Sequence, residues 1–386
     1  MQRIGLASAS LFVTLLVVSA SLSYGEVQVR YGGTIVIGTP TEPGTLNIAT
    51  TTDMNSHYIG PWILSSLVYQ DLDGKHQPHL AESWTLSSDG LVFVFNLVKN
   101  ARWHDGKPFT SADVKFTFEE VLKKYHPAGP TFTERIKSIE TPDDYTVKFT
   151  FSKPFGPFLT VLTTLYSAIL PKHLYENTDI RKNPYNMKLV GTGPFKFKEW
   201  VPGSHVVLEK SSDYWKGGKP YLDKVIFKFI PDPMARVLSL EKAEVDYLPH
   251  VVPFSEIPRL KANPNIEVVP SVQALGNQIF LGFNTRHPVL KEIEVRRAIA
   301  HAIDKNVLVD KAVYGFGKPA TGPIHVNLLV YTPVPSYSYD PAEANRLLDK
   351  AGYPKGADGF RFTLQLITDR ASFHVDKSSE IVREQL

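Results

Sequence analysis

The sequence predicts an α/β protein with two lobes. Its 386 residues exceed what a single hydrophobic core usually supports, so two compact units are expected. Residues 92–97 alternate with a period of two and carry apolar side chains on both sides, which predicts an inner strand covered on both faces. After a tight loop at 103–108, Thr110 lies three residues before Asp113, a weak capping box that predicts a helix starting there.

Charge and cysteine content exclude several classes of function. The chain has 42 basic and 39 acidic residues, and its formal net charge of +3 gives no strong field for nucleic acid or an anionic membrane. It has no cysteine, so disulfides and thiolate metal sites are absent. We therefore expect no nucleic-acid partner.

The first 25 residues have the pattern of a signal peptide. Arg3 supplies a short positive region, and residues 4–18 form an uncharged, mainly apolar run. Small residues at 18–20 and 23–25 offer two cleavage sites, so the mature chain is expected to start between Ser21 and Glu26. No other segment approaches the length of a membrane span, which predicts a soluble protein without stable membrane insertion.

Catalytic motifs are missing from the sequence. It contains no His-Glu-x-x-His, no Gly-x-Ser-x-Gly and no P-loop, and the Gly-x-Gly at 191–193 is followed by Pro194 instead of a helix start. His76 and His79 lie three apart, but no third ligand clusters nearby, so no metal site is expected. We interpret His104-Asp105 as a turn-stabilising pair. These observations predict a protein that is not an enzyme.

Short motifs in a fixed order carry a resemblance to a known family. The chain resembles family 5 of the extracytoplasmic solute-binding proteins, the peptide-, oligopeptide- and nickel-binding receptors of bacterial ABC importers. The motifs are the loop at 39–47, Ala-Glu-Ser-Trp at 81–84, Asp-Asp-Tyr-Thr-Val at 143–147, Pro-Lys-His at 171–173, Gly-Thr-Gly-Pro-Phe at 191–195, Lys-Pro-Tyr-Leu-Asp at 219–223, the helix at 295–304 and the segment at 339–354. Two positions depart from the family pattern: Ile48 replaces a proline and Ala243 replaces a glycine.

The resemblance implies a two-lobe periplasmic-binding-protein-like fold with mixed sheets and a hinge. It implies lobe I over residues 26–270 and a partial lobe II over 271–386, with an opening strand at 33–38 and strands at 280–285 and 362–367. Residues 60–70 are expected to form a buried helix. Family members run well past Leu386, which predicts a fragment or a small, incomplete second lobe whose last helix places Leu386 on its apolar side.

The function implied is capture of a small solute, with a di- or oligopeptide as the leading ligand, and its delivery to an ABC transporter permease. The lipid-modified cysteine of many relatives is missing, so we expect a freely diffusing periplasmic monomer without cofactors. A nickel-chelate or oligosaccharide receptor is the alternative within the family. A periplasmic interaction or chaperone-like protein without transport is the alternative outside it.

Candidate binding residues lie in loops near the ends of predicted elements. In open α/β lobes ligands gather beyond the carboxyl ends of strands, which points to Thr41 and Glu42 after the opening strand, Thr52 and Asp53 in the next loop, and Tyr69. Glu42 and Asp53 could each hold an ammonium group by a charge-assisted hydrogen bond. The alternative is that these acids only shape turns.

Arg370 is the remaining candidate. It follows the predicted strand at 362–367, and its position resembles that where dipeptide-binding members place an arginine on the terminal carboxylate of the ligand. A planar guanidinium can hold both carboxylate oxygens, which a lysine cannot do. The alternative is a solvated surface arginine that Asp369 neutralises.

Overall fold

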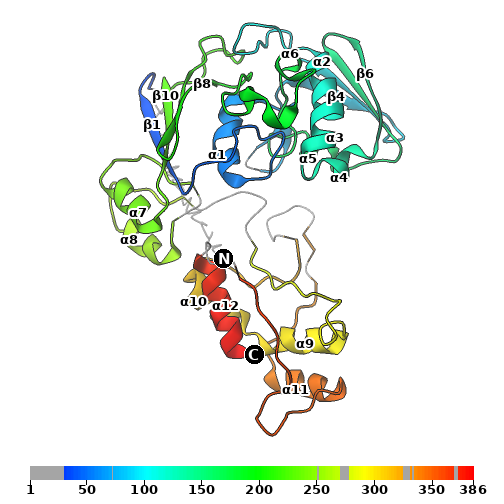
Figure 1. Ribbon diagram of the computed structural model, residues 1–386, viewed down its shortest axis with the longest axis vertical. Helices are drawn as coiled ribbons and strands as arrows, with labels where there is room; N and C mark the ends of the chain where they lie inside the picture. Colours follow the sequence, from blue (N-terminus) through cyan, green and yellow to red (C-terminus); the bar gives the residue numbers. More distant parts are fainter. Residues whose placement is uncertain are drawn as a thin grey trace, which may run out of the picture.

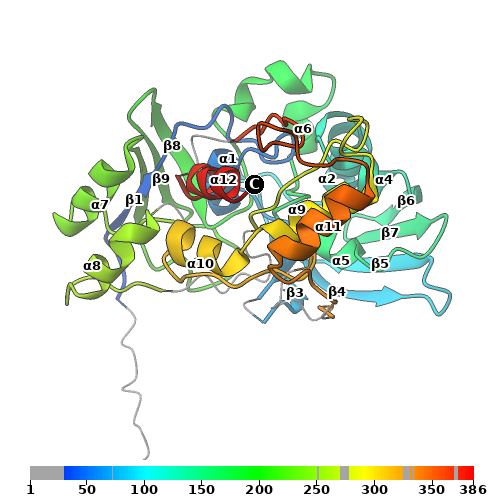
Figure 2. The same cartoon turned by 90° about the horizontal axis from the view of Figure 1, so that it is seen from below.

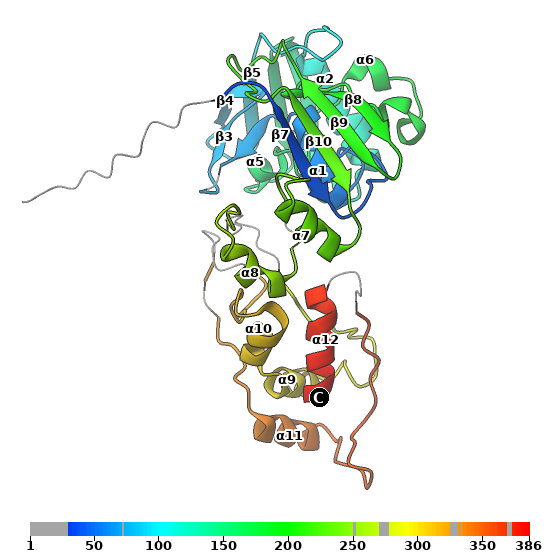
Figure 3. The ribbon, with the colours of Figure 1, turned by 90° about the vertical axis from the view of Figure 1, so that its left-hand side faces the viewer.

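The computed structural model describes residues 30–71, 73–249, 252–269, 278–324, 331–332, 334–368 and 373–386. The chain is elongated and has two bodies (Figure 1). We call residues 30–249 the sheet body and residues 278–386, as far as described, the helical body. Residues 252–269 lie between the two (Figure 3). The predicted signal peptide and Arg370 lie outside the described residues.

The first sheet of the sheet body contains the opening strand. Strand β1 (Thr34–Thr39) pairs in parallel with β10 (Lys224–Phe229), and β10 pairs antiparallel with β9 (His205–Lys210), which pairs with β8 (Phe195–Val201). The prediction of a β-branched strand at 33–38 is thus confirmed within one residue. Because β10 comes late in this body, the sheet closes the chain back onto its own beginning.

The second sheet has the order β4 (Ala81–Leu86), β5 (Val92–Leu97), β7 (Thr146–Phe151) and β6 (Ile136–Asp143), all antiparallel. Strand β5 lies between β4 and β7, so the predicted inner strand is confirmed. The expectation that both of its faces are covered is wrong. Its phenylalanines face the core, whereas the alternate residues are half-buried or exposed, as usual for an antiparallel sheet with one solvated face.

The predicted helix after Thr110 is present. It runs through α2 (Ser111–Phe116), a π-helical stretch η1 (Thr117–Leu122) and α3 (Lys123–Tyr125). The Asp113 carboxylate accepts a hydrogen bond from the Thr110 backbone N–H at 2.9 Å and a second from Lys172 N at 2.8 Å. The capping residue therefore also fixes the segment that begins α6.

The helix expected at 60–70 begins and ends earlier than predicted. Helix α1 (Met54–Ile63) is followed by β2 (Val68–Gln70), which pairs with β3 (His76–Pro78). The Gly193 N–H donates to the Ile63 carbonyl at 2.8 Å, and a Cβ at Gly191 would lie 1.8 Å from the same oxygen. The Gly-Thr-Gly loop thus packs against the carboxyl end of α1, and glycine is needed for this close approach.

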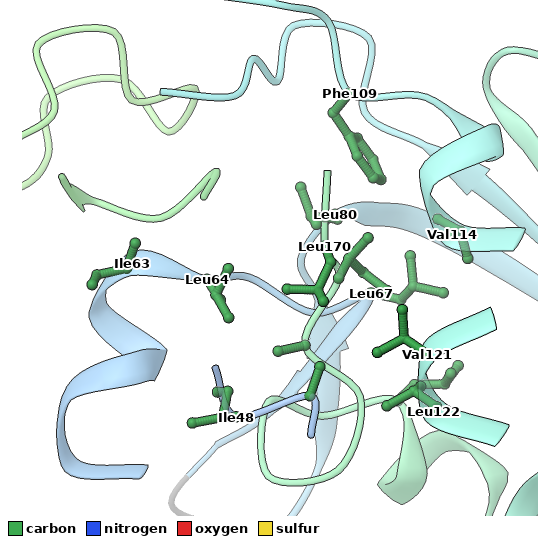
Figure 4. Packing of buried hydrophobic residues seen from close by; sticks show 14 of the residues in the cluster. Ile48, Ile63, Leu64, Leu67, Leu80, Phe109, Val114, Val121, Leu122 and Leu170 are labelled. Atoms are coloured by element: carbon green, nitrogen blue, oxygen red, sulfur yellow. The ribbon is translucent and has the colours of Figure 1, made fainter. Parts of the chain in front are cut away.

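One continuous core fills the sheet body. Side chains from α1, the extended segment after it and the α2–η1 helix meet there (Figure 4). Ile48, where relatives carry proline, is fully buried in this core. The short helices around it are α4 (Gly129–Thr133), α5 (Phe158–Val161), α6 (Lys172–Tyr175), η2 (Ile180–Lys182) and η3 (Pro184–Asn186).

The segment between the bodies is helical. Helix α7 (Pro233–Glu241) ends the sheet body, and η4 (Phe254–Glu256) and α8 (Ile257–Lys261) follow. Arg259 of α8 forms ion pairs with Glu241 of α7 and with Glu256. These pairs join α8 to the end of α7.

The helical body contains α9 (Ile293–Ala302), α10 (Lys305–Val313), α11 (Pro341–Lys350) and α12 (Phe373–Gln385). The helix expected at 295–304 is present as α9, and its Val295, Ala298 and Ile299 are buried. Leu386 lies just past α12 and is exposed, so its predicted place on the apolar side of the helix is wrong.

The strands expected at 280–285 and 362–367 are not formed. Both segments are extended, but no ladder partner lies beside them in the described part of the chain. A strand needs a neighbour that satisfies its N–H and C=O groups, and alternation of side chains alone does not supply one. Among the described helices, none is long and apolar enough to cross a membrane.

Candidate functional site

A large cleft of about 3480 Å³ lies between the two bodies. Figure 2 shows the structure from below, with α9–α12 in front of the sheet body. The sheet body contributes the loop after β1, the first turns of α1, the start of α7 and residues 245–248 to the wall of the cleft. These segments lie together because β1 and α1 are consecutive and residues 246–247 bond to β1.

Several hydrogen bonds fix residues 245–248 against β1. The Asp246 carboxylate accepts from Val36 N at 2.7 Å, and the Gly38 N–H donates to the Tyr247 carbonyl at 2.9 Å. The Tyr247 side chain is left half exposed and lines the cleft. A Tyr ring held on an anchored backbone offers apolar surface and a hydroxyl to a ligand at small entropic cost.

Tyr58 and Arg236 form the inner part of this wall. Tyr58 comes from the second turn of α1 and is partly buried, and burial raises the pKa of its hydroxyl. Arg236 of α7 donates through Nη1 to the carbonyls of Ile230 and Pro231, at 2.6 and 2.9 Å. Burial lowers the pKa of this guanidinium, and Asp232 and Tyr58 oppose the shift.

The helical body supplies extended backbone to the opposite wall. Residues 278–284 and 359–368 line the cleft, and several of their apolar side chains are exposed, with Phe280 at 84% and Ile367 at 85%. Within the described residues, no backbone group of 278–284 or 361–368 pairs with another strand. An extended ligand could therefore add as a strand to either segment.

The structure places the predicted residues Thr41, Thr52 and Asp53 around the start of α1. Thr41 is exposed and lines the cleft. Asp53 is the N-cap of α1 and accepts from Ser56 N at 3.0 Å, while its neighbours Met54 and Asn55 line the cleft. Thr52 is exposed beside this cap and is not one of the described cleft-lining residues.

Glu42 and Tyr69 lie apart from the described lining of the cleft. The Glu42 carboxylate accepts from Trp200 Nε1 at 2.6 Å and from Gly203 N at 2.9 Å, which holds the β8–β9 turn. The Lys216 ammonium lies over the Tyr69 ring, 5.0 Å from the ring centre. A ligand role for Thr41, Glu42, Thr52, Asp53, Tyr69 and Arg370 stays a prediction.

Tyr58, Arg236 and Tyr247 line the cleft but were not among the residues predicted from the sequence. Arg236 had a visible signal, because it is the only charge in the otherwise uncharged run 233–240 that forms a helix. Tyr58 and Tyr247 had none, since only the pairing of residues 246–247 with β1 brings them to one wall.

His104 has structural partners on both of its ring nitrogens. His104 Nε2 donates to the Gly193 carbonyl at 2.9 Å and its Nδ1 accepts from Gly191 N at 3.2 Å, which supports the interpretation of His104 as a turn-stabilising residue, although its turn partner is distant in sequence. Burial lowers the pKa of His79 to about 3. In the part of the chain that the structure describes, no group of three His, Cys, Asp or Glu could hold a metal ion.

Comparison with known proteins identifies the family. Residues 75–386 match the family described as bacterial extracellular solute-binding proteins, family 5. The oligopeptide-binding protein AppA of Bacillus subtilis is 32% identical over 384 residues, which cover 95% of this chain and 69% of AppA. A putative ABC transporter peptide-binding protein of Brucella ovis is 33% identical over 296 residues, which cover 75% of this chain. The same residues cover 54%, about half, of the Brucella protein.

Solved structures show the same fold. AppA of Bacillus subtilis in complex with a nonapeptide superimposes with a TM-score of 0.79 at 30% identity, covering 93% of this chain and 73% of AppA. DppA of Helicobacter pylori in complex with the peptide STSA gives a TM-score of 0.73 at 33% identity, covering 85% and 68%. The chain therefore belongs to family 5 of the bacterial extracellular solute-binding proteins.

Proposed function

We propose that this chain captures a di- or oligopeptide in the cleft between its two bodies and delivers it to the permease of an ABC importer. The observation that carries the proposal is the pair of extended segments, 278–283 and 361–368, that line the cleft without backbone–backbone hydrogen bonds among the described residues. Family membership and the peptide-bound structures of relatives support it.

The mechanism follows from the two walls. The backbone of an extended peptide alternates donors and acceptors, so it can pair with either segment whatever its side chains are. The opposite wall then offers Thr41, Tyr58 and Tyr247 to its side chains. Closure of the bodies around the peptide removes both walls from water and creates the surface that the permease recognises, so binding shifts a population of open and closed forms.

The remaining predicted site residues are part of the proposal. Arg370 is proposed to bind the terminal carboxylate of the peptide, and Thr52 and Tyr69 to extend the site from the sheet body. We propose that residues 1–25 direct export and are removed, leaving a periplasmic monomer. Sequencing the amino terminus of exported protein tests the cleavage, and retention of Met1 would contradict it.

The direct test is native mass spectrometry of protein purified without refolding, followed by calorimetric titration. We expect a co-purified peptide, or micromolar to nanomolar binding of peptides from a length series. Binding of a nickel–histidine complex or of an oligosaccharide instead of peptides would favour the alternative within the family. Suppression of aggregation of an unfolded client, with no small ligand bound, would favour the chaperone-like alternative.

Variants of Glu42 and Asp53 test whether these acids bind the peptide or only stabilise the fold. We expect Glu42→Ala and Asp53→Ala each to lower the free energy of unfolding by about 1 kcal/mol, because Gly203 N and Ser56 N lose their acceptors. Tyr247→Ala, in the cleft wall, is the matched comparison. Unchanged peptide affinity in the two acid variants, with a loss in Tyr247→Ala, would remove Glu42 and Asp53 from the site.

A further inference from the structure

The charge of the cleft wall differs from that of the whole chain. Its described lining has seven Lys and Arg residues and only two acidic ones, Asp246 and Glu267. The chain as a whole is nearly balanced, with 42 basic and 39 acidic residues. Positive charge is therefore concentrated on the surface that faces the ligand. The seven basic residues are Arg236, Lys261, Lys305, Lys318, Lys355, Arg361 and Arg383.

Three of these side chains gather around the loop 316–320, and we call them the lysine cluster. Lys261 of α8 places its ammonium 5.1 Å from the ring centre of Phe316, and Lys305 at the start of α10 donates to the Ala320 carbonyl at 3.3 Å. Lys318 lies on the loop itself and is exposed. None of the three forms an ion pair with another described residue.

The loop 316–320, around which the lysine cluster lies, is held by aromatic packing. Phe316 stacks on Phe254, with ring centres 6.1 Å apart and planes at 16°, and Phe254 also meets the His374 ring of α12 at 5.4 Å. These contacts join η4, the loop after α10 and α12 at one side of the cleft. The lysines are thus presented by a packed surface and not by a free chain end.

We infer that the cleft selects peptides that carry a carboxylate at the lysine cluster, and so prefers acidic peptides to basic ones. The inference rests on the proposed function and adds the class of peptide. A carboxylate beside this loop is attracted to the positive charges around it and can accept hydrogen bonds from ammonium N–H groups that are not already engaged. A basic side chain at the same place is repelled by the same lysines.

The size of the effect follows from partial solvation of the site. Because the lysines are partly or fully exposed, each interaction is screened by water and salt. For two charges several ångströms apart at such a site, we expect about a tenfold difference in affinity between matched acidic and basic peptides. The difference should shrink as the salt concentration rises.

The test is calorimetric titration of the whole chain with matched alanine-based peptides at three lengths, tri-, penta- and nonapeptides. Each length carries one central Glu, Gln or Lys, with free or amidated carboxyl termini. We expect Glu peptides to bind about tenfold more tightly than Lys peptides at low salt. The amidated series shows whether the carboxylate that matters is the side chain or the chain end.

A charge-matched pair of variants locates the effect. The triple variant Lys261→Gln, Lys305→Gln, Lys318→Gln should lose most of the difference between Glu and Lys peptides. The control is Lys123→Gln, Lys137→Gln, Lys153→Gln, three exposed lysines of the sheet body that do not line the cleft, with the same change in net charge. This control should keep the full difference, and the melting temperature of each variant shows that it is folded.

The outcomes separate the inference from the proposed function. If Glu, Gln and Lys peptides bind equally, the function stands and the charge preference is wrong. If both triple variants reduce the preference alike, net charge causes it and the lysine cluster does not. If no peptide of any length binds, the proposed function fails and the inference fails with it.

Discussion

The sheet body and the helical body differ in how their cores are built. In the sheet body, both sheets, α1 and the α2–η1 helix share one continuous core, whereas the helical body has two small clusters around Val295 and Ala298. Residues 92–97 and 362–367 both alternate with a period of two. The first segment has a neighbouring strand on each side and the second has none among the described residues. A strand is therefore specified by its neighbours as much as by its own pattern.

The five tryptophans offer a way to observe the bodies separately. All of them, at positions 62, 84, 103, 200 and 215, lie in the sheet body. Tryptophan fluorescence therefore reports unfolding of that body, while far-ultraviolet circular dichroism reports both. If the smaller clusters hold the helical body less firmly, denaturant should change the dichroism before the fluorescence.

The largest expected effect is that of Phe149→Ala. The Phe149 ring is fully buried and lies 5.0 Å from the rings of Phe118 and Phe158. Its removal leaves a cavity in the continuous core and should lower the free energy of unfolding by about 3–5 kcal/mol, measured by fluorescence in a denaturant titration.

Ile299→Ala is the matched variant in the helical body. Ile299 packs in the cluster around Val295, where most of the packed neighbours are only partly buried and can close around the gap, so we expect a loss of about 2 kcal/mol in the free energy of unfolding. The change should appear in the dichroism and leave the fluorescence midpoint unchanged. Equal shifts in both signals would show that the two bodies unfold as one unit.

Local chemistry was readable from the sequence. The Thr110–Asp113 pair predicted a helix start. The proline after the glycines at 191–193 excluded a nucleotide-binding loop there. Both conclusions depended on neighbours within a few residues. The end of α1 was missed because Ile63 ends the helix against the loop at 191–193, which is distant in sequence.

The site was less predictable than the fold for the same reason. Glu42 and Asp53 were chosen by their place after predicted elements, and the structure gives both carboxylates hydrogen bonds within the sheet body. Tyr247 reaches the cleft only through the pairing of its segment with β1. The lysine cluster combines α8, α10 and the loop after it, which no single segment of sequence indicates.

Acid should weaken the sheet body through His104. Burial lowers the pKa of His104 from 6.5 to about 4. The Gly191 N–H donates to His104 Nδ1, so a proton on Nδ1 would break this hydrogen bond. Above about pH 7 both the folded and unfolded forms are neutral at this residue. As the pH falls from 6.5 to 4, His104 binds a proton in the unfolded chain but not in the folded chain. The free energy of unfolding therefore falls by at most about 3 kcal/mol.

The variant His104→Gln removes this titration. Its free energy of unfolding, measured by fluorescence at a series of pH values, should depend less on pH between 6.5 and 4 than that of the parent. Above pH 7 the two slopes should agree, which serves as the internal control. An unchanged slope between pH 6.5 and 4 would assign the acid sensitivity to other groups.

The smallest expected effect concerns a strained turn beside the cleft. Ala243 has φ of 55°, a left-handed conformation that costs an L-residue about 1 kcal/mol and a glycine almost nothing. Because glycine also loses more freedom on folding, we expect Ala243→Gly to raise the free energy of unfolding by no more than about 1 kcal/mol, seen by fluorescence. Asn177→Gly, at φ of 61° in the same body, is the control, since asparagine already tolerates this conformation.

The turn at Ala243 leads directly into Asp246, whose carboxylate accepts a hydrogen bond from Val36 N. A gain in stability in Ala243→Gly that exceeds the gain in the control would show that this turn is strained. The strand pairing of the sheet body would then hold the cleft wall in place against that strain. The helical body lacks such pairing among its described residues, so the part of the dichroism change that precedes the fluorescence change should stay at the same denaturant concentration.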